Sequence, residues 1–132
     1  MDIFLTTGAF RTLTAAGRLA SAGGCRGFLL GHRRGDRVYI ESALPSPRSA
    51  WPSLESFYAL DADLERKIVG FFIWKPSAAA RMPLLQPFGT GKVLVELSGP
   101  AGKKPVLSGA VVDYEGRFIF RRIPVIVERP AP

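Results

Sequence analysis

The chain contains one cysteine and one histidine among its 132 residues. A single cysteine excludes an internal disulfide framework, so the fold must depend on its hydrophobic core. A zinc site usually takes three or four ligands, mostly His or Cys, and Cys25 and His32 are too few. On one extended strand they would lie roughly 23 Å apart at ~3.3 Å per residue, too far for a nucleophile and its base. We expect Cys25 to be a small buried residue and His32 an exposed turn residue.

The sequence also lacks a long hydrophobic run. No apolar stretch approaches the ~20 residues that a helix needs to cross a bilayer. Asp2 places an acidic residue where a secretory signal would be basic, and no long apolar centre follows it. We therefore expect a cytoplasmic protein with no membrane partner.

Apolar residues are plentiful, at 47% of the chain, with nine Phe and two Trp. A chain of this length and composition can bury the core of one domain. We expect a domain over residues 1–128 and a frayed tail over 129–132.

Basic residues outnumber acidic ones by 18 to 11, which gives a net charge of +7. This excess favours acidic partners, including nucleic acid, although a soluble protein from an arginine-rich proteome would have the same balance. Basic pairs occur at Arg33-Arg34 and at Arg121-Arg122. Phe118 and Phe120 lie close to the second pair, but strand alternation places both rings on one face, which is best explained as core. Nucleic-acid binding is therefore kept as an alternative function.

Hydrophobic periodicity predicts one helix followed by strands. Phe10 and Leu13 follow helical spacing within an expected helix over Thr7 to Ala22. Short apolar runs separated by Gly- and Pro-containing turns predict the strands. The expected strands are Arg26 to Gly31, Val38 to Ala43, Ser56 to Leu60, Ile68 to Trp74, Lys92 to Leu97, Val106 to Val112, and others within Arg117 to Val127. This order predicts an α+β domain in which an N-terminal helix packs on a mostly antiparallel, curved sheet of six to eight strands.

Two segments carry a family resemblance. Gly27 to Gly31 reads Gly-Phe-Leu-Leu-Gly, and Gly70 to Pro76 reads Gly-Phe-Phe-Ile-Trp-Lys-Pro. In this order and spacing they resemble the JAB/MPN (JAMM) family of zinc-dependent isopeptidases, whose second segment reads Gly-x-x-His-x-His-Pro. The resemblance covers roughly Thr6 to Val127 and implies an MPN-like fold. Relatives have a long helix before the motif glycine, and only Leu60 to Lys67 is available for one here.

The positions that carry chemistry in that family are changed in this chain. The two histidine positions are Ile73 and Lys75, the aspartate position is Gln86, and the catalytic glutamate position is Gly24. Isoleucine has no donor atom and lysine is normally protonated, so neither replaces an imidazole on zinc. Trp74 would lie in the former active-site cleft, as a core plug or as an anchor for a partner.

The resemblance therefore implies a catalytically inactive domain without a cofactor, which acts as a protein-binding or scaffold module. Its expected partner is another MPN domain or a second copy of the chain. The candidate partner-binding residues are Trp51, Trp74, Arg33, Arg34, Arg121 and Arg122. A groove beside an exposed strand would also accept an extended peptide. A metal-dependent (iso)peptidase with a relocated site and a basic nucleic-acid-binding domain remain the alternatives.

Overall fold

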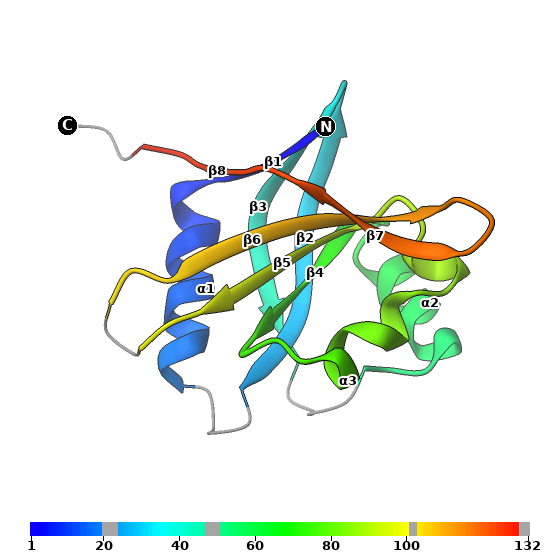
Figure 1. The fold of residues 1–132 in the computed structure, drawn as a ribbon, viewed down its shortest axis with the longest axis horizontal. Coiled ribbons are helices and arrows are strands. Elements are labelled where there is room, and N and C mark those ends of the chain that lie inside the picture. The colour runs from blue at the N-terminus through cyan, green and yellow to red at the C-terminus, as the bar shows by residue number, and fades with distance from the viewer. Residues whose placement is uncertain (20–23, 47–50, 101–102, 130–132) are drawn as a thin grey trace.

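A computed structural model describes residues 1–19, 24–46, 51–100 and 103–129 (Figure 1). Over these ranges the chain forms eight strands, three α-helices and two short 3-10 helices. Their order is β1 (Asp2–Leu5), α1 (Thr7–Leu19), β2 (Cys25–Arg34), β3 (Arg37–Pro45), α2 (Leu54–Asp63), β4 (Ile68–Trp74), α3 (Ala78–Arg81), η1 (Met82–Leu84), η2 (Pro87–Gly89), β5 (Val93–Ser98), β6 (Val106–Tyr114), β7 (Phe118–Ile123) and β8 (Val125–Val127).

The strands form one mixed sheet in the order β7-β6-β5-β4-β2-β3-β1-β8. The pairs β4–β5, β1–β3 and β1–β8 are parallel, and the other neighbours are antiparallel. The two edge strands, β7 and β8, follow one another in the sequence, and β8 also contacts β6. The sheet therefore curls into a nearly closed barrel.

Each face of the sheet has its own hydrophobic core. On one face α1 packs on the sheet through Ala9 and Leu13, next to Ile3 and Phe72. On the other face Phe57 of α2 and neighbouring apolar side chains cover the central strands. Figure 1 shows α1 and the α2–α3 pair on opposite sides of the sheet. Since both faces are covered, β4 is apolar along its whole length.

The expected MPN-like α+β fold, with one N-terminal helix on a mostly antiparallel sheet, is wrong. Three of the seven strand pairings are parallel, the sheet nearly closes, and helices cover both faces. Parallel neighbours need a crossover connection, and α3 with the two 3-10 turns supplies it between β4 and β5.

Two elements were also misassigned. The chain begins with a strand, β1, ahead of the expected helix. The segment predicted as a strand over Ser56 to Leu60 lies within α2. The side chain of Ser53 accepts a hydrogen bond from Ser56 N at 3.2 Å, which caps the first turn of this helix. Phe57, Leu60 and Leu64 then recur at helical spacing and pack in the same core.

The α1 helix ends at Leu19 among the described residues, so the expected end at Ala22 lies outside them. Of the predicted tail, Arg129 is exposed and residues 130–132 also lie outside. None of the helices that the structure describes is both long and apolar enough to span a membrane.

Candidate functional site: an apolar groove beside β3

Of the five positions that the resemblance assigned to a former site, all except Gln86 lie at the junction where β2 begins and β4 ends. Cys25 pairs with Trp74 in the sheet, which places Gly24 beside Trp74 and Lys75. Gly24 has a φ of 82°, and a Cβ atom there would overlap the carbonyl oxygen of Trp74. Glycine is therefore required by both backbone conformation and space, and a glutamate does not fit at this position.

Trp74 is part of the core. It is 8% exposed, its indole Nε1 donates to Leu13 O at 2.8 Å, and its ring lies against Gly17 of α1. The neighbouring Ile73 is 2% exposed and packs on the opposite face. The ring of Trp74 is therefore packed in the core and is not available as an anchor for a partner.

The remaining former-site residues are exposed. Lys75 follows the last residue of β4 with a φ of 58°, and its backbone N–H donates to Leu97 O at 3.0 Å. Gln86 lies between η1 and η2, where its side-chain amide donates to Pro83 O at 2.9 Å. These residues do not fit a zinc ion, since none of them offers an imidazole or a carboxylate. Among the described residues, no three His, Cys, Asp or Glu side chains gather to hold a metal ion.

The second tryptophan also belongs largely to the fold. The Nε1 of Trp51 donates to Ala80 O at 2.6 Å, and its ring meets Phe71 edge-on at 5.4 Å. The Arg26 guanidinium lies 5.5 Å from the centre of the same ring. Trp51 is therefore half-buried between the loop and the sheet.

Cys25 and His32 both lie on β2. The thiol of Cys25 is half-buried beside Ala16 O at 3.7 Å, and desolvation raises its pKa. The imidazole of His32 stacks on Tyr39 at 5.2 Å, with Nδ1 3.0 Å from a Glu41 carboxylate oxygen. His32 is thus a strand residue, and its expected place in a turn is wrong.

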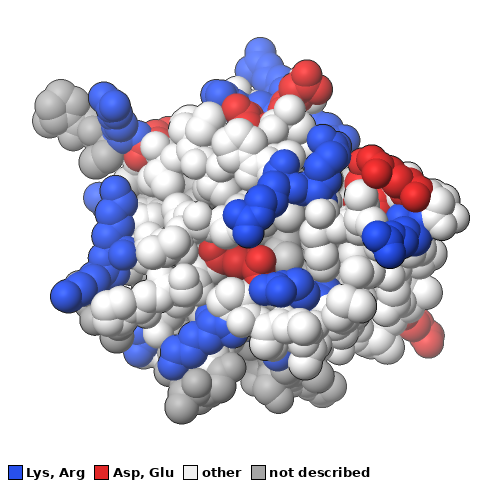
Figure 2. Space-filling model, viewed as in Figure 1, with Lys and Arg blue, Asp and Glu red and all other residues white. Residues whose placement is uncertain are grey.

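The basic pairs are split between different environments. All four arginines are exposed, but only Arg33 and Arg121 line one cavity between the β2–β3 turn and the β6–β7 hairpin. On the face shown in Figure 2, basic side chains are spread out with acidic and uncharged residues between them. Phe120 packs at the margin of the core that contains Phe57, whereas Phe118, expected in the same core, is half-buried against the ring of Tyr114 at 5.1 Å.

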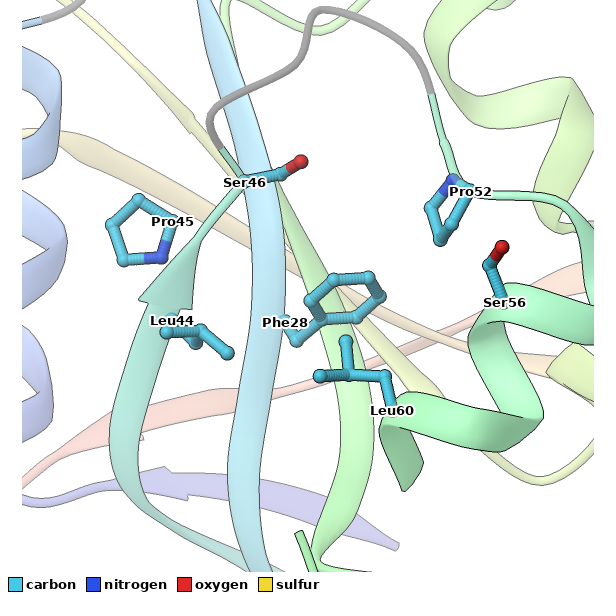
Figure 3. A pocket seen from close by; sticks show the side chains of 7 residues that line it. All are labelled: Phe28, Leu44, Pro45, Ser46, Pro52, Ser56 and Leu60. Atoms are coloured by element: carbon cyan, nitrogen blue, oxygen red, sulfur yellow. The ribbon is translucent and has the colours of Figure 1, made fainter. Parts of the chain in front are cut away.

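An open apolar cavity of about 400 Å³ lies between β3 and α2. Figure 3 shows Phe28 of β2 between two walls, Leu44 and Pro45 on one side and α2 on the other. We call this cavity the apolar groove. Its lining residues are Phe28, Leu44, Pro45, Ser46, Pro52, Ser56 and Leu60.

The outer edge of β3 runs beside this groove. The partner strand β1 pairs with β3 only from Arg37 to Ile40, and the Thr6 hydroxyl donates to Glu41 O at 3.3 Å. No described strand pairs with this edge from Ser42 to Pro45. Ser46 N donates across to Arg26 O, so by alternation Ala43 directs its N–H and C=O away from β2.

Sequence reasoning expected a groove beside an exposed strand but did not identify the residues that line it. Its residues come from β2, β3, α2 and the loop that precedes α2, and no local motif joins them. The prolines of the loop and the alternation of β3 indicated one wall of the groove. The other wall was not predicted, because the segment that forms α2 was expected to be a strand.

No protein-family model matches the chain, and no curated protein matches it in sequence. A similar solved structure is the solution structure of protein DSY2949 from Desulfitobacterium hafniense, a Northeast Structural Genomics Consortium target. The two are 20% identical with a TM-score of 0.68, over 97% of this chain and 94% of that one. This likeness shows that the two chains share a fold.

Proposed function

We propose that this domain binds an extended segment of a partner protein without cleaving it. The segment would pair with β3 from Ser42 to Pro45, where no described strand covers its outer edge, and place one apolar side chain in the apolar groove. The observation that carries this proposal is the position of an open apolar cavity directly beside unpaired strand edge.

The groove and the edge contribute different parts of recognition. Burying one large apolar side chain contributes about 1.5–3 kcal/mol, which is too little for specific binding by itself. Main-chain hydrogen bonds to Ala43 would add affinity and fix the direction of the bound segment. The net charge of +7 favours a segment with acidic residues around the apolar one.

A peptide selection tests the proposal. Random peptides displayed on phage would be selected against the purified chain, and a selected peptide would be titrated by calorimetry and NMR. We expect selected peptides to share one large apolar residue, and the largest amide shifts to fall at Phe28, Ala43 and Leu60. Failure to select any peptide, or shifts that map away from β3 and α2, would contradict the proposal.

Two variants of α2 separate groove binding from nonspecific effects. Ser56 is exposed and lines the groove, so Ser56→Trp should fill it and weaken the peptide by about tenfold or more. Ala62 is exposed on the same helix but outside the lining, so Ala62→Trp should leave the affinity unchanged. Equal affinities for both variants would place the binding site elsewhere.

Mass spectrometry of the peptide after incubation tests whether it stays intact. Cleavage that a chelator abolishes would instead favour a metal-dependent (iso)peptidase with a relocated site. Pairing with an MPN domain or with a second copy stays a prediction, and native mass measurement tests the second copy. The cytoplasmic location also stays a prediction.

A further inference from the structure

A second cavity of about 400 Å³ lies at the mouth of the barrel, away from the apolar groove. Its walls come from the β2–β3 turn on one side and from β6 and β7 on the other, with the Thr90 turn between them. Val111 and Val112 line it as well and are almost fully buried. The mouths of β-barrels are frequent places for small-ligand sites.

Arg33 contributes one guanidinium to this cavity. Its Nη2 contacts Gly91 O at 3.4 Å and the sulfur of Met1 at 3.5 Å, both neutral acceptors at long distance. Among the described residues it forms no ion pair. An arginine held by two weak contacts keeps most of its five donors for another acceptor.

Arg121 contributes the second guanidinium, which one hydrogen bond joins to Asp113. Its Nε donates to Asp113 Oδ2 at 3.2 Å, while Asp113 Oδ1 accepts from Tyr114 N at 2.8 Å. The carboxylate therefore holds the guanidinium along one side. Within the part of the chain that the structure describes, the terminal Nη groups of Arg121 have no hydrogen bond.

The remaining lining residues set the charge of the cavity. Asp36 adds a carboxylate without an ion pair among the described residues, and Thr90 adds a hydroxyl donor. The lining therefore holds two arginines and two carboxylates. Asp113 is paired with Arg121, and Asp36 is in no ion pair among the described residues. Two guanidinium forks on opposite walls suit an anion with several oxygens, because each fork binds two of them.

We propose that this cavity binds a small phosphomonoester, with its phosphate group between Arg33 and Arg121. The Thr90 hydroxyl would donate to a phosphate oxygen, and Val111 would contact the organic part. The cavity volume exceeds what a phosphate alone fills, which favours a phosphorylated small molecule over free phosphate. A nucleic-acid backbone would be expected to use the exposed Arg34 and Arg122 as well.

Calorimetry with adenosine monophosphate, inorganic phosphate and a short single-stranded oligonucleotide tests this proposal. We expect millimolar or tighter binding of the monophosphate and weaker binding of inorganic phosphate. The absence of binding of both probes would overturn the proposal. It would also be overturned by an oligonucleotide that binds tighter and loses affinity equally on changing Arg34 or Arg33, since this would indicate a nucleic-acid surface.

Charge variants should change the affinity for the monophosphate in two opposite directions. Arg33→Gln and Arg121→Gln should each weaken the monophosphate by about tenfold or more, the loss of a charge-assisted hydrogen bond. Asp36→Asn should tighten it severalfold, because a repelling carboxylate is removed. Arg34→Gln is the matched control and should change nothing, since Arg34 does not line the cavity. A loss with Arg34→Gln equal to that with Arg33→Gln, or weaker binding by Asp36→Asn, would contradict the site.

Separate control measurements test whether each variant folds and whether the apolar groove affects binding. Each variant should keep the thermal midpoint of the wild type, and Arg33→Lys should bind between wild type and Arg33→Gln because charge remains but the fork is lost. Ser56→Trp should leave monophosphate binding intact, because Ser56 lines the apolar groove and not this cavity. The failure of one proposed site is therefore distinguishable from the failure of the other.

Discussion

The β2–β4 junction and the apolar groove both use β2, but they differ in the space they leave. At the junction Gly24 meets the Trp74 backbone and the indole fills the room beside α1. At the groove β3 and α2 leave an open cavity of about 400 Å³ between them. The segments that resemble the JAB/MPN motif therefore lie in a packed part of the fold. The open groove is formed by residues that belong to no recognised motif.

The largest expected effect comes from placing a glutamate at Gly24. Gly24→Glu forces a side chain into the Trp74 carbonyl at a φ of 82°, and should cost about 4 kcal/mol or prevent folding. Gly35→Glu is the control, because Gly35 has a φ of 61° but open space around it, and should cost about 1 kcal/mol. Urea unfolding measures both, and similar costs would mean that the junction is less tightly packed.

A smaller effect tests the packing of Trp74 on α1. A Cβ atom at Gly17 would overlap the indole, so Gly17→Ala should cost about 2 kcal/mol despite better helix propensity. In a Trp74→Leu background the same change should become neutral or stabilise by up to about 1 kcal/mol. A double-mutant cycle in urea measures this difference, and additive changes would refute the contact.

Acid should weaken the seam between β8 and α1. The Glu128 carboxylate accepts from Thr7 N at 3.1 Å and from Thr7 Oγ1 at 2.9 Å, and these bonds lower the pKa of Glu128. Its stabilisation is complete above the unfolded pKa of about 4.3 and is lost as pH falls through the lower folded value.

The urea midpoint of the wild type should therefore fall more steeply from about pH 5 to pH 3 than that of Glu128→Gln. Glu115→Gln, in the exposed β6–β7 turn, is the control and should follow the wild type. Parallel pH curves for wild type and Glu128→Gln would show that this contact contributes nothing.

The smallest effect is expected at the groove. Because Ser56 faces open space, Ser56→Trp should change the free energy of unfolding by less than about 0.5 kcal/mol. A large loss of stability would show that the groove is closed in solution. Gly24→Glu and Ser56→Trp together compare how much the free energy of unfolding falls when a large side chain is added at the junction and at the groove.

Sequence patterns predicted the central strands well because their residues are buried on both faces. The apolar run of β4 was predicted with the bounds that the structure shows, Ile68 to Trp74. β1 was missed because four residues are too few to show a period, and its partners at Arg37 and Val125 are distant in sequence. The helical identity of α2 depended on the Ser53 cap and on Phe57 packing, which tertiary contacts decide.

The groove was unpredictable for a further reason. Counting from the β2–β3 turn pairs Phe28 with Ala43, but a bulge between Leu30 and Gly31 shifts the register by one. Leu44 therefore lies opposite Phe28, on the same face. The bulge needs Gly31, where a Cβ atom would overlap the Tyr39 carbonyl, and the sequence alone does not reveal that approach.

The place of β1 between β3 and β8 has a consequence for how the protein matures. β1 is synthesised well before β8, so one of its edges stays uncovered until β8 has emerged. Contacts so distant along the chain slow folding. During translation the uncovered edge of β1 is open to pairing with other chains.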